Sequence, residues 1–308
     1  MTRLAAVDCG TNSVRLLVSD VAGGAKHDVH REMRIVRLGE GVDATGELSQ
    51  PALARTADAL AGFATTCDRL GADRVRMVAT SATRDARNAG EFAGLVRQVL
   101  GVDPVVATGA EEAALSFAGA TRELDPADGP FLVVDIGGGS TEVVLGGVAV
   151  RAARSVDVGC VRLTERRLLG DPPGAAEVAA ARADVDEALE LVAAAVPVHE
   201  ARTVVGLAGS VTTVAALALG LKAYDPTRLH LARLTAPQVR EATARLLAAT
   251  REQRAAMPFM HPGRVDVIGA GALVLLAVVE RFGVAELVVS ESDILDGIVW
   301  AMSEGSGP

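Results

Sequence analysis

The chain has 308 residues, of which 50% are hydrophobic and 22% are charged. This is the composition of a globular protein of one large or two ordinary domains, and it excludes a disordered chain. The formal net charge of −9 argues against a general nucleic-acid binder, although a local site could still hold a phosphate substrate.

The cysteines and the apolar segments bear on the location of the protein. The three cysteines, Cys9, Cys67 and Cys160, are too far apart for a disulfide framework or a metal-ligand pair. The N-terminus runs into a strand-like segment without the pattern of a signal peptide, and the uncharged apolar stretch 267–279 is too short to cross a bilayer. We therefore expect a cytoplasmic protein with neither a membrane nor a nucleic-acid partner.

Strands and helices are predicted to alternate in the first part of the chain. Ser49 as N-cap, Pro51 in the first turn and Gly71 as a stop signal predict one helix between them. Gly23-Gly24 predicts a hairpin turn. The other predicted elements are strands at 4–7, 14–18, 75–79 and 105–107, and helices at 91–100 and 111–124.

The pattern restarts after residues 125–130, a polar segment rich in Asp, Pro and Gly that predicts a linker. The apolar periodicity then predicts strands at 131–135, 143–145, 202–205 and 286–289, and helices at 175–196, 235–249, 267–282 and 293–302. A second Gly-Gly turn is expected at Gly146-Gly147.

Two loops in the chain repeat each other. The runs Asp8-Cys-Gly-Thr-Asn-Ser13 and Asp135-Ile-Gly-Gly-Gly-Ser140 place Asp, Gly and Ser at the same offsets, 127 positions apart. Each run follows a short apolar strand and precedes another. These matching flanks predict a duplicated α/β domain; the alternative is two unrelated hairpins within one sheet.

A strand that ends in Asp and continues into Gly-x-x-Ser is typical of a phosphate loop. Its backbone N–H groups point into one concavity, and glycine lets a phosphate approach closely. Asp135 would repel phosphate, so we expect it to hold Mg²⁺ directly or through water, with Glu142 returning to the same ion. The alternative is that Asp135 merely initiates its own turn.

Other charged residues lie near these loops. Arg15, Arg84 and Arg162 could bind phosphate, and Arg84 is best placed because hydroxyl residues surround it. A solvated or salt-bridged role is the alternative for each. Glu111-Glu112 opens a predicted helix, where one carboxylate could act as the general base toward an attacking water. Alternatively, both acids only support the helix dipole.

Five segments together resemble the exopolyphosphatase/guanosine pentaphosphate phosphohydrolase (Ppx/GppA) family: residues 8–17, 79–84, 108–113, 135–142 and 206–213. The resemblance extends to about Trp300 and is greatest to short actinobacterial-type exopolyphosphatases. It implies an α/β protein with a duplicated actin/hexokinase/Hsp70-like (ribonuclease H-like) two-domain fold and an interdomain active-site cleft. The domains implied are 1–126, onto which a C-terminal helix at 293–304 packs back, and 127–292.

The resemblance also implies roles for individual residues, taken position by position. Glu112 matches the family's catalytic base, and Asp135 and Glu142 match its Mg²⁺-associated acids. The residues that match its phosphate-binding positions are Thr11, Asn12, Ser13, Arg84, Gly137, Gly138, Gly139 and Ser140.

The function implied is a Mg²⁺-dependent hydrolase that releases the terminal phosphate of inorganic polyphosphate, with guanosine pentaphosphate (pppGpp), a nucleotide of the stringent response, as a second candidate substrate. A kinase of the same superfamily that uses ATP and an actin-like nucleotide-binding scaffold are the alternatives. A homodimer is left open. Long family members carry additional C-terminal helical domains, so we expect this chain to prefer short polyphosphate and to act distributively.

Overall fold

The computed structural model describes residues 1–305, which form two compact units. One unit comprises Met1–Gly119 together with the helix that begins at Ile294, and the other comprises Ala120–Asp293. These are units of packing. The assignment of two actin-like domains with a boundary at 126/127 stays a prediction.

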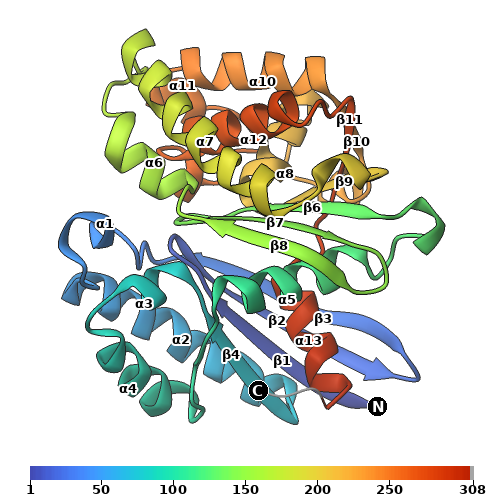
Figure 1. Cartoon of the computed structure of the whole chain (residues 1–308). Helices are drawn as coiled ribbons and strands as arrows, with labels where there is room; N and C mark the ends of the chain where they lie inside the picture. Colours follow the sequence, from blue (N-terminus) through green and yellow to red (C-terminus); the bar gives the residue numbers. More distant parts are fainter. Residues whose placement is uncertain (306–308) are drawn as a thin grey trace. The chain divides into compact units, whose positions relative to one another are not determined.

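The first unit contains a five-stranded mixed sheet in the order β3-β2-β1-β4-β5 (Figure 1). Strands β1 to β3 form an antiparallel meander, whereas β4 and β5 run parallel to β1. The strands are β1 (Thr2–Cys9), β2 (Ser13–Ala22), β3 (Ala25–Ile35), β4 (Arg74–Ala79) and β5 (Val105–Val106). The helices are α1 (Val42–Thr45), α2 (Gln50–Leu70), α3 (Ser81–Asp85), α4 (Ala89–Leu100), α5 (Gly109–Thr121, which ends in the second unit) and α13 (Ile294–Ser303).

Helices cover both faces of this sheet. Helices α2 and α4 bury Phe63 and Phe92 against one face, and α13 packs on the other face over β1. Burying such side chains stabilises each layer by roughly 1.5–3 kcal/mol per residue. Asp296 of α13 is also buried, and it is bound by Lys26 at 2.8 Å and by Arg31 at 2.9 Å, which fixes α13 to β3.

The second unit contains a six-stranded sheet in the order β10-β11-β9-β6-β7-β8. The strands are β6 (Phe131–Ile136), β7 (Thr141–Gly146), β8 (Val150–Val156), β9 (Thr203–Leu207), β10 (Arg233–Thr235) and β11 (Glu286–Val289). The α-helices are α6 (Cys160–Arg167), α7 (Ala175–Ala195), α8 (Ala208–Ala218), α9 (Pro226–Leu229), α10 (Ala236–Ala248), α11 (Arg251–Ala255) and α12 (Ile268–Arg281). Short 3-10 helices lie at Pro126–Asp128, Val198–Glu200 and Pro262–Arg264.

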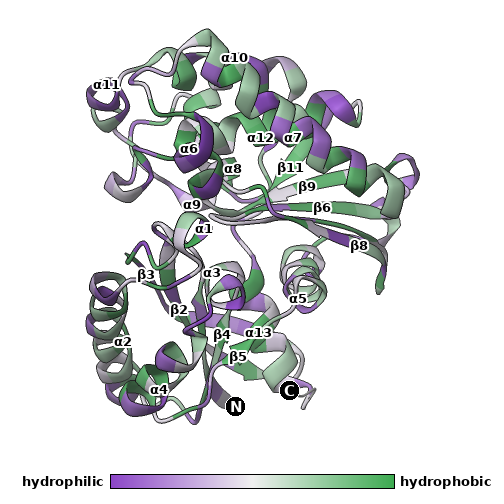
Figure 2. Cartoon of the chain, turned by 60° about the vertical axis from the view of Figure 1, so that its left-hand side comes forward, coloured by the Kyte–Doolittle hydropathy of each residue, from purple (hydrophilic) through white to green (hydrophobic). Residues whose placement is uncertain are grey.

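One large apolar core fills the second unit, between one face of its sheet and helices α7, α8, α10 and α12. Helix α12 is buried along almost its whole length, which agrees with the uncharged apolar run that predicted it. Hydrophilic residues gather on outlying elements such as α11 (Figure 2). Among residues 1–305, no helix is long and apolar enough to span a membrane.

Five strands of each sheet share one topology, which confirms the predicted duplicated α/β fold, and the second sheet adds β10 at its edge, antiparallel to β11. In each, an antiparallel meander (β1–β3 or β6–β8) is followed by strands parallel to its first strand. The repeated loops close with the same hydrogen bond, since the Gly10 and Gly137 amides donate to the Ser13 and Ser140 carbonyls, each at 3.0 Å. The alternative interpretation, that the loops belong to two unrelated hairpins within one sheet, is therefore wrong.

Some element boundaries differ from those predicted. Helices α3 and α6 were not predicted, because both are short and follow glycine or hydroxyl-rich segments. Helix α5 begins at Gly109 and ends at Thr121, because Thr108 caps it earlier than the two acids suggested. The second Gly-Gly pair forms a longer connection than a two-residue turn, since β7 ends at Gly146 and β8 begins at Val150.

Candidate functional site

The first loop, residues 10–13, is fixed by its neighbours. The Thr11 hydroxyl lies 2.9 Å from the Ser81 hydroxyl, and the Thr11 carbonyl accepts the Gly39 amide at 2.8 Å. The Asn12 carbonyl accepts the Arg37 amide at 2.9 Å. Because these bonds use the carbonyl oxygens of the loop, Thr11, Asn12 and Ser13 present a rigid turn of the kind that binds anions.

Asp8 lies one residue before the end of strand β1, and it is almost fully buried. Its antiparallel partner on β2 is Arg15. The Arg15 Nη2 and Nε atoms donate to Asp8 Oδ2 at 2.6 and 3.0 Å. The charge of Asp8 is therefore balanced within the first unit.

Glu112 lies in the first turn of α5 and is 8% exposed. Arg84 Nη1 donates to Glu112 Oε2 at 3.0 Å and to the Ala107 carbonyl at 2.9 Å. The structure thus brings together two residues that lie far apart in the sequence and that were predicted separately as base and phosphate ligand. The N-terminal dipole of α5 favours the ionised carboxylate, which is the form that can accept a proton.

Glu111, the other acid of the pair, has a different environment. Its carboxylate accepts from the Thr108 amide and hydroxyl, each at 2.8 Å, and the Thr108 hydroxyl lies 3.2 Å from the Glu111 amide. This reciprocal capping box lowers the pKa of Glu111 through the Thr108 backbone and side-chain hydrogen bonds. Glu111 is therefore a helix cap, which leaves Glu112 as the candidate base.

The second loop, Gly137 to Ser140, is held by α6. The Gly137 and Gly138 carbonyls accept the amides of Cys160 and Val161 at 2.9 and 2.8 Å. A side chain at Gly159 would place its Cβ only 2.4 Å from the Gly138 oxygen, so glycine is required for this close approach. The loop and the start of α6 thus form one rigid unit.

Asp135 and Glu142 lie beside this loop as direct antiparallel partners on β6 and β7. Such partners point to the same face with Cβ atoms about 4.5–5.5 Å apart. They are 8% and 1% exposed, and Ser155 on β8 donates to Glu142 Oε1 at 2.6 Å. Two adjacent buried carboxylates repel each other unless a cation or proton compensates them, so this pair fits a divalent cation.

The number of ligands indicates which kind of cation suits the pair. Among residues 1–305, no group of three or more His, Cys, Asp or Glu side chains is arranged to hold a metal. Zn²⁺ and Ca²⁺ sites need more protein ligands, whereas Mg²⁺ is held by one or two carboxylates with water and substrate phosphate completing its octahedron. Asp135 and Glu142 are therefore candidate ligands for a divalent cation of this kind.

The cysteines near the loops are not nucleophiles. Cys9 and Cys160 are buried, and burial raises the pKa of each thiol above its ordinary value. Their thiolate forms are therefore disfavoured at neutral pH.

The structure adds a group at the end of β9 that the sequence did not indicate. Leu207 on β9 is the register partner of Asp135, and α8 begins at the next residue. Arg264 reaches the first turns of α8: its Nη1 lies 3.3 Å from Thr213 Oγ1, and its guanidinium carbon lies 5.9 Å from the centre of the Tyr224 ring. No local sequence pattern links Arg264 to α8, because the two meet only through tertiary folding.

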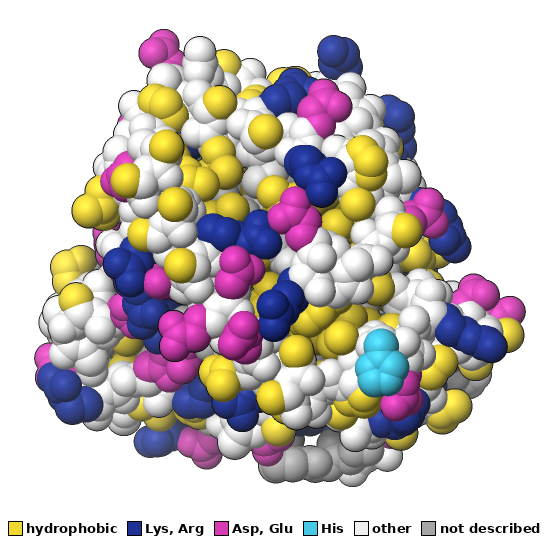
Figure 3. Space-filling model, turned by 45° about the horizontal axis from the view of Figure 1, so that its top comes forward, with side chains coloured by type: hydrophobic (Ala, Val, Ile, Leu, Met, Phe, Trp, Pro, Cys, Tyr) yellow, Lys and Arg dark blue, Asp and Glu magenta, His cyan; other side chains and the backbone are white. Residues whose placement is uncertain are grey.

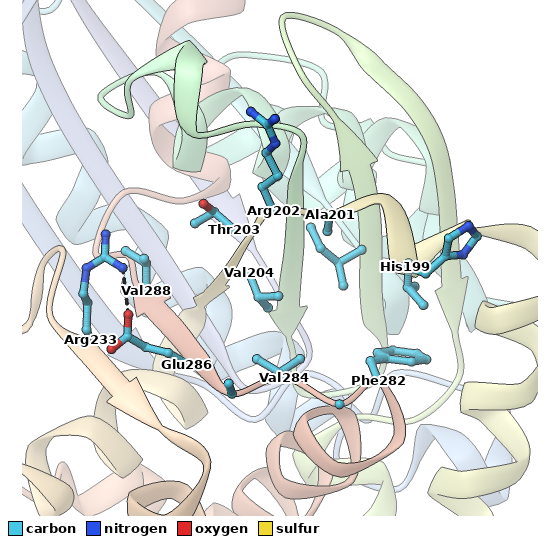
Figure 4. A pocket seen from close by; sticks show the side chains of 14 residues that line it. His199, Ala201, Arg202, Thr203, Val204, Arg233, Phe282, Val284, Glu286 and Val288 are labelled. Atoms are coloured by element: carbon cyan, nitrogen blue, oxygen red, sulfur yellow. Dashed lines mark hydrogen bonds and ion pairs between the residues drawn. The ribbon is translucent and has the colours of Figure 1, made fainter.

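A cavity of about 340 Å³ lies elsewhere in the second unit (Figure 4). It is lined where β9 and β11 begin, by Val204 and Glu286 among others, and so it opens at the opposite end of the sheet from Asp135. Arg233 and Glu286 pair across its edge at 2.7 Å. The cavity therefore belongs to no part of the candidate site.

The duplicated sheets, each with an Asp-x-Gly loop at the end of its first strand, define a two-unit α/β protein of the actin-like class. A solved structure of an exopolyphosphatase-like protein has the same fold, with a TM-score of 0.95, 41% sequence identity and 99% of each chain covered.

Comparison with protein families is more specific. The model of the Ppx/GppA phosphatase family matches residues 17–304. The chain is 53% identical to Exopolyphosphatase 2 of Mycobacterium tuberculosis over 98% of this chain and 99% of that protein. It is 29% identical to the guanosine-5'-triphosphate,3'-diphosphate pyrophosphatase of Aeromonas salmonicida, over 97% of this chain and 59% of that protein. The chain belongs to the Ppx/GppA phosphatase family, which confirms the resemblance and the predicted class of enzyme.

Proposed function

We propose that this protein is an exopolyphosphatase that hydrolyses the terminal phosphoanhydride bond of inorganic polyphosphate. The observation that carries the proposal is Glu112, a buried carboxylate at a helix N-terminus that is held by Arg84. The similarity to Exopolyphosphatase 2 of M. tuberculosis over nearly the whole chain supports the choice of substrate.

Glu112 acts in this proposal as the general base. It accepts a proton from the water that attacks the terminal phosphorus, a role that contributes about 10²–10⁴-fold to the rate. Arg84 orients Glu112 through one nitrogen, and since a guanidinium has five N–H donors it can bind a phosphate oxygen at the same time. An inert scaffold needs no such base.

The two loops supply the groups that bind the phosphates. Backbone N–H groups of Thr11, Asn12 and Ser13, and those of residues 138–140, donate to phosphate oxygens and stabilise the charge that spreads over them in the transition state. Hydrogen bonds hold each loop in one conformation, so substrate binding costs less conformational entropy.

Asp135 and Glu142 hold Mg²⁺ in this proposal, and Ser155 orients Glu142 by donating to its Oε1 atom. When bound, Mg²⁺ neutralises phosphate charge and polarises phosphoryl oxygens. The adjacent carboxylates, Asp135 and Glu142, keep their own position because both lie inside a paired strand rather than on a mobile loop.

A phosphate-release assay with Mg²⁺ tests the proposal. The panel is inorganic polyphosphate, pppGpp and ATP, with no phosphoryl acceptor other than water. We expect release from polyphosphate, and pppGpp is a second candidate because the A. salmonicida relative bears that activity in its name. A kinase would release phosphate only slowly without an acceptor, and a scaffold would pellet in a nucleotide-dependent manner; either result contradicts the proposal.

The cellular setting is part of the proposal. The composition and the cysteine pattern support a cytoplasmic enzyme that uses no nucleic-acid or membrane partner. Hydrolysis of pppGpp would connect it to the stringent response. Sedimentation at micromolar concentration decides between a monomer and a homodimer.

We also propose that the enzyme prefers short polyphosphate. Arg31, Arg34 and Arg37 form the nearest candidate for a basic track, but Arg31 is paired with Asp296 and Arg34 with Glu32. On the face shown in Figure 3, Lys and Arg side chains are interspersed with Asp and Glu. A long polyanion therefore meets a net charge of −9 without a guiding row of cations. Gel analysis should show chains that shorten together; intact chains beside final products would contradict this.

A further inference from the structure

Two stretches of the chain connect the units. The chain passes from the first unit to the second after Gly119 and returns after Asp293. On the side of the second unit, these stretches are residues 120–125 and residues 290–293. Each stretch is short, so the path of its backbone depends on the hydrogen bonds that its residues form.

Both stretches meet at one side chain, His230. Its Nε2 atom lies 3.0 Å from Glu123 Oε2 in the first stretch. Its Nδ1 atom accepts the backbone amide of Glu291, in the second stretch, at 3.2 Å. Because Nδ1 accepts, Nε2 carries the hydrogen and donates it to Glu123. The Ser292 hydroxyl also lies 3.5 Å from Glu123 Oε1. We call these four residues the His230 bridge.

The backbone beneath the bridge is anchored. The amide of Leu231 donates to the Val289 carbonyl, and the Val289 amide donates to the Ala232 carbonyl, both at 2.8 Å. The Ser290 amide donates to the Gly206 carbonyl at 2.9 Å, which extends β11 along β9. His230 therefore projects from a part of the sheet that cannot easily shift.

The bridge is also connected to the candidate site. Tyr224 donates its hydroxyl hydrogen to Glu291 Oε1 at 2.7 Å, and its oxygen lies 2.9 Å from Thr212 Oγ1 on α8. Helix α8 begins directly after Leu207, the register partner of Asp135. A continuous set of contacts thus links the connecting stretches to the strand end that bears the acidic pair.

We propose that His230 is a positioning residue that ties the two connecting stretches together and, through Glu291, Tyr224 and α8, holds the strand end that bears Asp135 in place for the reaction. This proposal rests on the proposed function for its kinetic consequence. Element-terminal residues far from the chemistry can alter kcat and KM together when they are changed. His230 directly follows α9 and fits that description.

Two conservative variants separate the two bonds. His230→Asn keeps an acceptor at the position of Nδ1 and so retains the Glu291 amide. His230→Gln keeps a donor at the position of Nε2 and so retains Glu123. His230→Ala removes both, and His199→Ala is the matched control, because His199 is an exposed histidine of the same unit.

Hydrogen exchange measures the bridge directly. We expect the amides of residues 120–125 and 290–293 to exchange about tenfold faster in His230→Ala, with α12 unchanged. In His230→Gln only 290–293 should accelerate, and in His230→Asn only 120–125. Equal exchange in wild type and His230→Ala would overturn the bridge. If His230→Ala does not fold, the Asn and Gln variants still decide the outcome.

Kinetics measure the positioning role. With polyphosphate as substrate, we expect kcat/KM of His230→Ala to fall about tenfold, within the usual range of coupling between sites, with both kcat and KM affected. The Asn and Gln variants should each recover part of the loss. If hydrogen exchange shows that the bridge is lost but kcat/KM is unchanged, the positioning role of His230 is overturned. A wild-type protein that releases no phosphate would refute the proposed function instead, and the exchange data would still decide the bridge.

Discussion

Arg15 and Glu142 occupy equivalent positions in the two copies of the repeat. Each is the antiparallel partner of the aspartate that precedes a phosphate-type loop: Arg15 faces Asp8, and Glu142 faces Asp135. In the first unit the pair is an ion pair with a 2.6 Å contact. In the second unit the equivalent pair consists of two carboxylates, those of Asp135 and Glu142. The duplication therefore keeps the backbone and changes the charge of the pair, from an ion pair in the first copy to two acids in the second.

Removing one charge of the second pair tests this difference. We expect Glu142→Gln to raise the thermal stability of the protein in chelator, because it relieves repulsion between two buried like charges. Mg²⁺ should stabilise the wild type by mass action and the variant much less. Activity should fall sharply in Glu142→Gln and in Asp135→Asn. Glu200→Gln, at the exposed Arg151–Glu200 pair, is the control for both melting and activity. A variant that melts as the wild type does, with and without Mg²⁺, would exclude this site.

Substitutions of Glu111 and Glu112, the two adjacent glutamates of α5, should have different effects on stability and on kcat. Glu112→Gln keeps its hydrogen bond to Arg84 but cannot accept a proton, so kcat should fall by about 10²–10⁴ with little change in stability. Glu111→Ala removes the capping box and should lower the free energy of unfolding while leaving kcat nearly intact. Steady-state kinetics and urea unfolding of both variants check the assignment. The reverse pattern would exchange the two roles.

Gly159 is predicted to be intolerant of a side chain. In Gly159→Ala the new Cβ would stand 2.4 Å from the Gly138 oxygen, so the second loop must move. We expect a loss of about 1–3 kcal/mol in stability and, since small displacements at an active site are costly, a fall of about 10²-fold in kcat/KM. Gly147→Ala is the control, because nothing lies within 4 Å of its added Cβ.

Thr83 in α3 should tolerate loss of its hydroxyl. It is fully buried, and among the described residues its Oγ1 has no hydrogen-bond partner. Thr83→Val removes this desolvated group and should leave stability unchanged or raise it by about 1 kcal/mol. Thr56→Val should instead lose about 1 kcal/mol, because the equally buried Thr56 hydroxyl donates to the Ala52 carbonyl at 2.8 Å. Urea unfolding of the pair distinguishes the two effects.

The stability of the protein at alkaline pH should depend on the ionisation of Tyr224. Burial, and then the negative charge of Glu291, raise the pKa of Tyr224 to about 12 from its ordinary 10.0. The folded state thus holds its proton more tightly, so this contribution to stability is intact below pH 10 and is lost as the pH rises toward 12. Since Tyr224 is the single tyrosine, tyrosinate absorbance follows it directly. A native titration midpoint near 10 would contradict this raised pKa.

The local signals in the sequence were sufficient for much of the fold. Helix α2 lies between the caps Ser49 and Gly71, with Pro51 in its first turn, as predicted. Helix capping depends on residues within one turn, so the local sequence is sufficient to predict it. The repeated Asp-x-Gly loops predicted the duplication, because a tight turn with an anion-binding face needs glycine and a short polar residue at fixed offsets. The family motifs extended this to the site residues, position by position.

Only tertiary structure decided which residue serves which purpose. The sequence could not separate Glu111 from Glu112, because the distinction depends on Thr108 capping one and Arg84, 28 positions earlier, binding the other. It could not connect Arg264 to α8, or His230 to Glu123 and Glu291, since these contacts join segments that no periodicity relates. Short-range patterns determine helices, turns and loops, whereas charge compensation and hydrogen-bond partners depend on which strands and helices the folded chain places side by side.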